Sequence, residues 1–183
     1  MERAMKISKF DIDALAKIRK NVDVFLATCA YKYSKSETFL LDIAPQDHAG
    51  AAPFFLSSEI STLDIDPKSG ATFIEDLCSS NFSVNQNYFD YVVCTEVLEH
   101  TLQPFKAVEN IFSCLKPGGL AFVSTPFNFR IHGPLPDCWR FTEHGLRALF
   151  SSNFEIVELN ALEDEERSLM PFQYTLVARK SAD

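Results

Sequence analysis

The sequence lacks several patterns that mark particular classes of protein. Its five cysteines are an odd number, and no two of them have the Cys-x-x-Cys spacing that is typical of structural zinc sites. We therefore predict neither a disulfide framework nor a metal site. No apolar run approaches the length of a membrane span, and residues 1–13 contain no apolar signal core. These absences favour a protein of the reducing cytoplasm that does not contact a membrane.

Positive charge and glycine-rich turns are also scarce. The net charge is −8, and the lysines and arginines form no basic run. Because nucleic acids bind basic patches, we do not expect a nucleic-acid partner. No Gly-x-Gly-x-x-Gly turn follows the strand expected at residues 38–43. A nicotinamide-dependent oxidoreductase is therefore the weakest of the functions that we consider.

The composition is otherwise that of an ordinary globular domain. The chain has 183 residues, of which 46% are apolar and 23% charged, and this length predicts a single domain with a real core. Seventeen phenylalanines are many for this length. We expect them mainly to fill the core, although a surface for a partner protein is the alternative.

The most informative stretch lies between residues 89 and 127. Its apolar spacing predicts a buried strand at 90–94, a helix at 104–115 and a second buried strand at 120–124. Lys116 and the Pro-Gly-Gly that follows it are expected to end the helix. The three elements form a βαβ unit, whose ligand crevice lies beyond the carboxyl ends of its strands.

Four motifs in this stretch resemble the second half of a class I S-adenosylmethionine (SAM)-dependent methyltransferase. In order and spacing they are closest to the small-molecule, methyltransferase-11-like branch with the VLEH…LKPGG signature. The motifs are Asp90–Val93, Glu96–His100, Leu115–Gly119 and Ser124–Pro126. The resemblance implies a Rossmann-like α/β fold in three layers, with a seven-stranded, mostly parallel sheet and an antiparallel C-terminal strand.

The rest of the chain can be divided on the same pattern. Residues 1–37 are expected to hold a helix at 9–28 and a linker, 38–125 the cofactor-binding half, and 126–183 a lid, a helix and a closing hairpin. Further strands are predicted at 38–43, 59–64, 71–74, 153–160 and 172–179, and a helix starts after Thr142. Only a short segment that contains Pro67-Lys68-Ser69-Gly70 connects the strands at 59–64 and 71–74. It is too short for a helix crossover, so one edge of the sheet is expected to be trimmed.

The cofactor implied by the resemblance is SAM, with S-adenosylhomocysteine (SAH) as its product. The family carries an Asp-x-Gly-x-Gly turn after the first strand. Here Asp42 matches, but Ala44 and Gln46 replace the two glycines. Ala44 fits if its φ is negative, whereas Gln46 requires a turn of another shape.

Two further acids are assigned to the adenosyl group. Asp64 ends the second strand and is predicted to accept hydrogen bonds from the ribose hydroxyls, with a turn acid before Pro67 as the alternative. Asp76 and the backbone N–H of Leu77 match the adenine contacts of the family, and a helix cap is the alternative for Asp76. The full set of predicted cofactor-binding residues is Asp42, Ala44, Asp64, Ile65, Asp76, Leu77, Thr95 and Glu96.

The acceptor side is expected between the fourth strand and the lid. His100 and His132 are candidate general bases, and a structural role is the alternative for His100. In the lid, Asp137, Trp139 and Arg140 are predicted to contact the acceptor. Arg140 would bind an anionic group or pair with Asp137, and a well-packed connecting loop is the alternative for the lid as a whole.

The function implied by the resemblance is methyl transfer from SAM to an unidentified small-molecule acceptor, with a sugar or another metabolite as the candidate class. A homodimer is compatible with this function. The altered turn after the first strand supports an alternative, a catalytically silent methyltransferase-like protein that acts as a partner or regulatory subunit.

Overall fold

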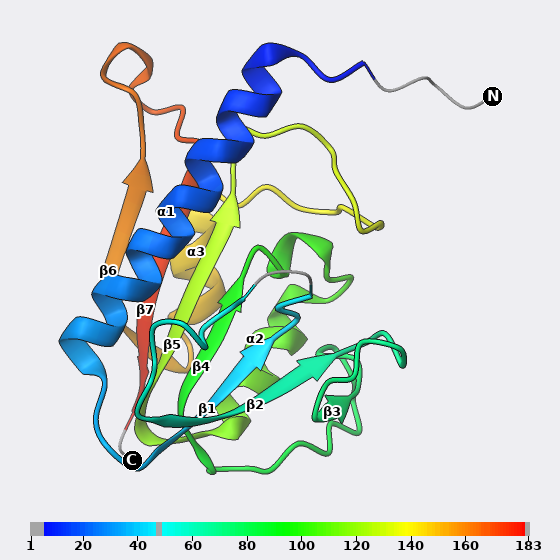
Figure 1. Cartoon of the computed structure of the whole chain (residues 1–183), viewed down its shortest axis with the longest axis vertical. Coiled ribbons are helices and arrows are strands. Elements are labelled where there is room, and N and C mark those ends of the chain that lie inside the picture. Colours follow the sequence, from blue (N-terminus) through cyan, green and yellow to red (C-terminus); the bar gives the residue numbers. More distant parts are fainter. Residues whose placement is uncertain (1–5, 47–48, 182–183) are drawn as a thin grey trace.

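A seven-stranded β-sheet forms the centre of the protein (Figure 1). The structure, a computed structural model, describes residues 6–46 and 49–181. The strands are β1 (Thr38–Ile43), β2 (Ser58–Asp64), β3 (Phe73–Ile74), β4 (Phe89–Thr95), β5 (Leu115–Pro126), β6 (Phe154–Leu162) and β7 (Gln173–Lys180). They lie in the order β3-β2-β1-β4-β5-β7-β6, and only β7 runs antiparallel to its neighbours. The predicted sheet is thereby confirmed.

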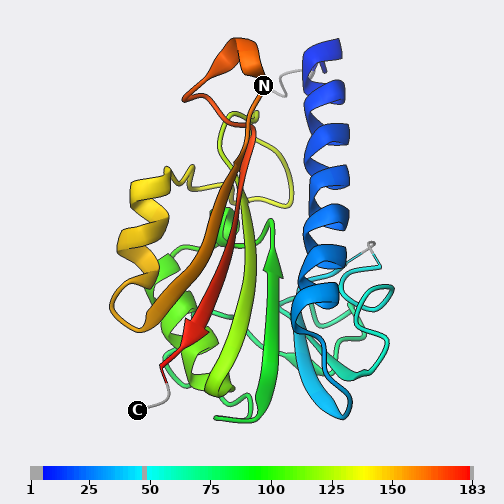
Figure 2. The ribbon, with the colours of Figure 1, turned by 90° about the vertical axis from the view of Figure 1, so that its left-hand side faces the viewer.

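Helices cover both faces of this sheet and complete the three layers. Figure 2 shows α1 (Lys9–Tyr33) on one face and α2 (Pro104–Cys114) with α3 (Glu143–Phe150) on the other. Two short 3₁₀ turns are η1 (Leu98–His100) and η2 (Glu165–Arg167). A capping box between Ser8 and Asp11 starts α1. This helix extends five residues beyond the predicted end at residue 28. The linker between α1 and β1 is therefore only residues 34–37.

Alternating strand residues supply two apolar cores, one on each face. Leu40, Tyr91 and Phe122 point toward α1 and pack with Leu26 of that helix. Their neighbours Leu41, Val92 and Ala121 point the other way and pack against α2 and α3. The largest fully buried side chains include four phenylalanines, which confirms their predicted use in the core: Phe55, Phe89, Phe122 and Phe150.

The end of α2 differs from the prediction. The helix ends at Cys114, and β5 begins at once with Leu115, so the Lys-Pro-Gly-Gly segment belongs to the strand. Lys116 does not cap the helix, because its Nζ lies 2.8 Å from Oδ2 of Asp90 at the start of β4. A Cβ at Gly119 would lie 3.1 Å from the carbonyl oxygen of Asp90. The second glycine therefore permits close packing of the two strands rather than stopping a helix.

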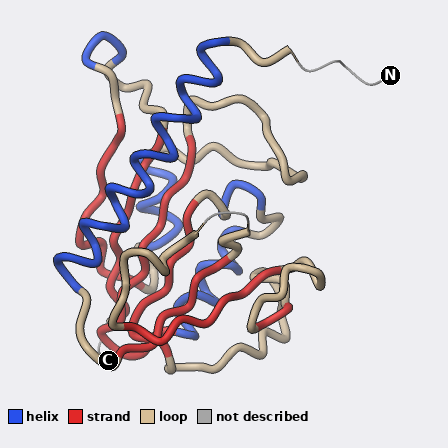
Figure 3. Tube along the Cα trace, viewed as in Figure 1, coloured by secondary structure: helices blue, strands red, loops and turns tan. Residues whose placement is uncertain are grey.

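The β3–β2 side of the sheet is trimmed, as predicted. Across the described residues, no helix connects β1 to β2 or β2 to β3, and β3 has only two residues. Figure 3 shows tan loops leaving the ends of these strands, together with a longer loop after β5. In the same described part of the chain, none of the helices combines the length and the apolar character that crossing a membrane requires.

Candidate active site

The order of the strands locates the ligand crevice. From β1 the chain proceeds to β2 and β3 on one side, whereas β4 and β5 lie on the other side. The direction therefore reverses between β1 and β4, and ligands of open α/β sheets bind beyond the carboxyl ends at such a point. Asp42 and Ala44 stand at the end of β1, and Thr95 and Glu96 stand at the end of β4.

The turn after β1 keeps a glycine-like backbone without glycine. Ala44 and Gln46 both have φ of 50°, in the left-handed region. Ala44 therefore does not meet the condition of a negative φ under which it was expected to fit, and Gln46 adopts the backbone conformation that glycine would supply. The left-handed conformation is open to any L-residue at a cost of about 1–2 kcal/mol, and the surrounding fold imposes it here.

A glycine that the sequence reading missed lies further along this loop. Gly50 has φ of 55°, and a Cβ on it would lie 2.1 Å from Oδ2 of Asp42. The loop thus returns against the Asp42 carboxylate, which accepts the N–H of Ala51 at 2.7 Å. Burial raises the pKa of Asp42 to about 6, although the Ala51 hydrogen bond acts in the opposite direction.

The strained turn gives a stability prediction. Gln46→Gly should raise the free energy of unfolding by about 0.5–1 kcal/mol, because glycine removes the left-handed strain and offsets its own entropic cost. Urea unfolding of the two proteins measures the difference. The control is Ala148→Gly on the exposed surface of α3, which should lose about 1 kcal/mol. A loss in both variants would show that residue 46 is unstrained.

The residues predicted for the adenosyl group lie along the same edge. Asp64 is 4% exposed at the end of β2, and its Oδ1 accepts the N–H of Asp66 at 2.8 Å. Asp76 follows β3 and accepts the N–H of Cys78 at 2.8 Å, so it stabilises a turn and not the helix start that its alternative required. Leu77 is buried, whereas the Ile65 side chain is 67% exposed.

Glu96 is held firmly at the end of β4. Its backbone has φ of 55°, which is strained for glutamate. Its Oε1 accepts hydrogen bonds from Ser124 Oγ and Gln173 Nε2, both at 2.7 Å. Burial raises the pKa of Glu96, against the effect of these two donors. Ser124 comes beside Glu96 through the parallel pairing of β5 with β4, and Gln173 through the antiparallel pairing of β7 with β5. Neither contact was predicted, because both depend on strand register.

The lid, defined here as residues 127–142, is attached to η1 through backbone bonds. The N–H groups of Cys138 and Trp139 donate to the carbonyl oxygen of Glu99 at 2.7 and 3.1 Å. The indole N–H of Trp139 donates to the Thr101 carbonyl at 2.8 Å. The lid is therefore docked beside the segment that follows β4, as expected for a loop that leaves β5 (Figure 1).

Arg140 fixes the shape of the lid from within. Its guanidinium pairs with Asp137 through both nitrogens, with Nη2 at 2.7 Å from Oδ2, and also donates to the Arg130 carbonyl. Of its two suggested roles, the structure shows the pairing with Asp137. Burial alone would raise the pKa of Asp137, but Arg140 and the N–H of His132 outweigh it and lower this pKa to about 2.

Docking of the lid brings two histidines to one buried carboxylate. Nε2 of His100 lies 3.6 Å and Nε2 of His132 lies 3.9 Å from Oε1 of Glu99. The Glu99 side chain is fully buried, and neither carboxylate oxygen has a hydrogen-bond partner among the described residues. Burial, and then the Glu96 carboxylate, raise the pKa of Glu99 well above its usual range, whereas burial lowers the pKa of His132.

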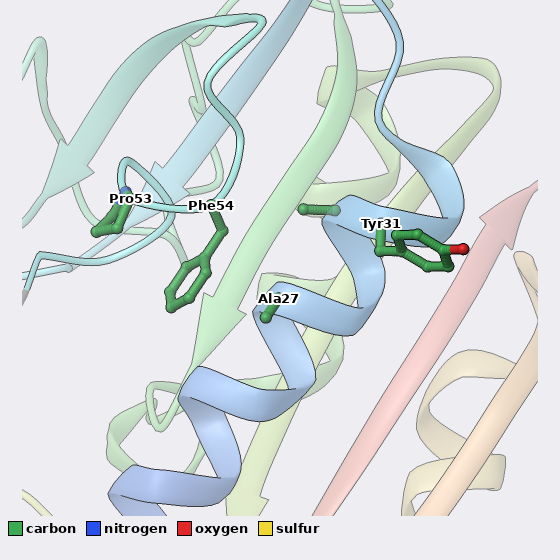
Figure 4. A pocket seen from close by; sticks show the side chains of 5 residues that line it. Ala27, Tyr31, Pro53 and Phe54 are labelled. Atoms are coloured by element: carbon green, nitrogen blue, oxygen red, sulfur yellow. The ribbon is translucent and has the colours of Figure 1, made fainter.

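A surface hollow lies away from these strand ends. It has a volume of about 330 Å³ and is lined by Ala27, Ala30, Tyr31, Pro53 and Phe54, between α1 and the loop before β2 (Figure 4). Tyr31 is 93% exposed and points its hydroxyl away from the hollow. The lining is otherwise apolar and offers no group for proton transfer, so we do not assign the reaction to it.

Comparison with known proteins agrees with this geometry. A family model described as a methyltransferase domain matches residues 20–166, most of the chain. The chain belongs to the methyltransferase domain family. Among curated proteins, the ubiquinone biosynthesis O-methyltransferase of Haemophilus ducreyi is 39% identical over 54 residues. That match covers 30% of this chain and 23% of the relative, so the chain spans less than a quarter of the length of that enzyme.

Solved structures show the same methyltransferase fold over nearly the whole chain. A SAM-dependent methyltransferase from Methanosarcina mazei has a TM-score of 0.66 at 17% identity, covering 84% of this chain and 97% of that one. The 1,6-didemethyltoxoflavin-N1-methyltransferase of Burkholderia thailandensis, with bound 1,6-didemethyltoxoflavin and SAH, has a TM-score of 0.63 at 14% identity and covers 99% and 93%. At these identities the likeness establishes the fold.

Within this methyltransferase domain, the predicted residues fall into two groups. Those assigned to the cofactor line the ends of β1, β2 and β4 and the loop after β3. His100 and His132 meet at Glu99, which the sequence reading did not select. A signal for Glu99 was present, because a charged residue stands directly after two apolar ones in the Val-Leu-Glu-His motif.

Proposed function

We propose that this protein transfers a methyl group from SAM to a small-molecule acceptor, with residues 38–125 holding the cofactor and 126–183 covering the acceptor. The observation that carries this proposal is the reversal of strand order between β1 and β4, with Asp42, Asp64, Thr95 and Glu96 at the adjoining strand ends. Membership of the methyltransferase domain family supports it. The bound SAH in the Burkholderia thailandensis relative supports the choice of cofactor.

Each predicted residue has a specific task in this proposal. Asp64 accepts the ribose hydroxyls, and Asp76 with the N–H of Leu77 contacts the adenine, beside Ile65. Asp42, Ala44, Thr95 and Glu96 line the methionine end. Bound SAM supplies an electrophilic methyl group on its sulfonium. The protein aligns the acceptor with that group, and such alignment supplies about 7–11 kcal/mol in favourable cases.

The proposed class of acceptor is supported by the exposed side chains near the lid and by the net negative charge of the chain. Trp139 of the lid is partly exposed, and Leu102, which follows the Thr101 that binds the indole N–H, is exposed. These two side chains suit an apolar portion of the acceptor. The net charge of −8 disfavours a polyanion such as nucleic acid. Cys138 and Cys78 are free thiols, as are the three buried cysteines, which fits a reducing cytoplasm. Sedimentation of the purified protein tests the proposed homodimer.

The alternative, a silent partner protein, rested on the loss of two glycines. The structure weakens that argument, because Ala44 and Gln46 adopt the left-handed backbone that glycine would supply. Gly50 additionally lets the loop close on Asp42. We therefore favour an active enzyme over a regulatory subunit.

Calorimetric titration with SAH tests the proposal. The wild type should bind SAH with micromolar affinity and should not bind NADH. Asp64→Ala should weaken SAH binding by about 1.5–3 kcal/mol, because the variant loses a charged acceptor for the ribose hydroxyls. This loss is roughly a 10- to 150-fold change in Kd.

Two variants control this titration. Asp66→Ala removes an exposed acid two residues away and should leave the affinity unchanged. Asp64→Asn keeps the shape of the side chain and separates the loss of charge from loss of folding. Absence of SAH binding by the folded wild type would favour the partner-protein alternative, and unchanged affinity in Asp64→Ala would remove this residue from the site.

A further inference from the structure

The two histidines at Glu99 are oriented by acceptors on their far sides. Nδ1 of His100 lies 2.9 Å from the carbonyl oxygen of Pro136, in the lid. Nδ1 of His132 lies 3.1 Å from Oδ2 of Asp137 and 3.3 Å from the Arg130 carbonyl. Because all of these partners accept hydrogen bonds, each Nδ1 carries the proton. In a neutral imidazole the lone pair is then on Nε2.

Three electron-pair donors therefore converge on one point. Both Nε2 atoms face the Glu99 carboxylate, and the three ligand atoms of Glu99, His100 and His132 lie within 4.8 Å of one another. Among the described residues, no hydrogen-bond donor satisfies either oxygen of this fully buried carboxylate. A buried carboxyl group that faces two lone pairs is stabilised by a proton or by a cation that lies between them.

We propose that Glu99, His100 and His132 bind a divalent transition-metal ion, with Zn²⁺ as the first candidate. Two histidines and one carboxylate are an established donor set for zinc and other first-row metals, and they leave open positions for further ligands. Imidazole nitrogen argues against Mg²⁺ or Ca²⁺, which prefer oxygen. The sequence expectation of no metal site rested on cysteine spacing and does not cover this set.

The distances suit an ion with modest adjustment. Zinc bonds of about 2.0–2.1 Å in tetrahedral geometry place ligand atoms roughly 3.3 Å apart. The observed separations from Glu99 are 3.6 Å to His100 and 3.9 Å to His132, so small side-chain movements suffice. The N–H of each histidine already has the acceptor on its far side that metal-bound histidines usually have.

The ligand set also joins two separate parts of the chain. Glu99 and His100 belong to η1, whereas His132 belongs to the lid. An ion at this point would cross-link the lid to the end of β4, beside the proposed methyl donor. The open positions would take an oxygen or nitrogen of the acceptor and lower its pKa. Only this use of the ion rests on the proposed methyl transfer; the site itself rests on the side-chain geometry.

Titration of chelator-treated protein with Zn²⁺ tests the inference. We expect one ion per chain with micromolar or tighter affinity, and no comparable binding of Mg²⁺. His100→Asn, His132→Asn and Glu99→Gln should each weaken Zn²⁺ binding more than about 100-fold. Co²⁺ should bind the wild type with visible absorption bands that report nitrogen and oxygen ligands, and Glu99→Gln should abolish them.

The matched control is His144→Asn, which removes an exposed histidine of α3 and should leave the affinity unchanged. Glu99→Gln keeps the side-chain shape and removes a buried charge, so this variant is expected to fold even if the histidine variants do not. No Zn²⁺ binding by the wild type, or binding that survives in Glu99→Gln, would overturn the inference. SAH titration of the same samples reports the cofactor site independently, so failure of one proposal is distinguishable from failure of the other.

Discussion

An Arg140→Ala variant should have a free energy of unfolding about 3–5 kcal/mol below that of the wild type. Arg140 donates to both carboxylate oxygens of Asp137 and to the carbonyl oxygens of Arg130 and Phe129. The Asp137 side chain has 0% exposure, so removal of the arginine leaves a charge buried without its main partner. The loss should therefore be that of a broken buried pair rather than that of a surface contact.

Urea unfolding measures this loss, and the position of the single tryptophan makes the result more specific. Far-UV circular dichroism follows the whole domain, whereas fluorescence of Trp139 follows the lid in which it lies. The control Arg147→Ala breaks an exposed pair with Glu143, whose side chains are 48% and 47% exposed. It should lose only about 0.3–0.5 kcal/mol. Similar small losses in both variants would show that the Arg140 pair does not hold the lid.

Asp42→Asn should stabilise the protein by up to about 3 kcal/mol above pH 6. The pKa of Asp42 is raised from 3.8 to about 6, so the fold disfavours the ionised form. A difference of this size corresponds to about 3 kcal/mol. The stability that protonated Asp42 contributes to the wild type is fully present below pH 3.8 and is lost as the pH rises through 6. The advantage of the variant should accordingly shrink as the pH falls from 6 toward 3.8.

The measurement is the difference in unfolding free energy between variant and wild type across this pH range. Taking the difference cancels the titration of the other acids. Asp66→Asn serves as the control, because its carboxylate is exposed at the same edge of the sheet, and its difference should stay near zero. If the difference in unfolding free energy between Asp42→Asn and the wild type does not change with pH, burial does not destabilise the ionised carboxylate of Asp42.

The sheet could be predicted because its strands carry local signals. The apolar runs before Asp42 and Cys94 mark buried strands by composition, and the change to helical spacing after Pro104 marks the crossover helix. Lys116 was misplaced because a Pro-Gly-Gly segment stops a helix and starts a bulged strand equally well. The ion pair with Asp90, a contact between two strands, decides between these readings.

The candidate site was harder to predict than the sheet, since its geometry depends on distant contacts. The left-handed backbone of Gln46 is not encoded by that residue type, which rarely adopts it. Glu99 acquires its importance only when the lid places His132 beside it. Neither a spacing rule nor a propensity links these two positions, so the pairing emerges only from the folded chain.

The absence of crossover helices after β1 and β2 has an electrostatic consequence. Helix N-termini carry a partial positive charge, and nucleotide-binding sheets direct such ends at phosphates. Across the described residues no helix begins in the loops that follow β1, β2 or β3. The buried carboxylates of Asp42 and Asp64 stand instead at the ends of β1 and β2. This part of the sheet edge therefore lacks, among the described residues, the helix ends that stabilise a pyrophosphate group in other nucleotide-binding sheets.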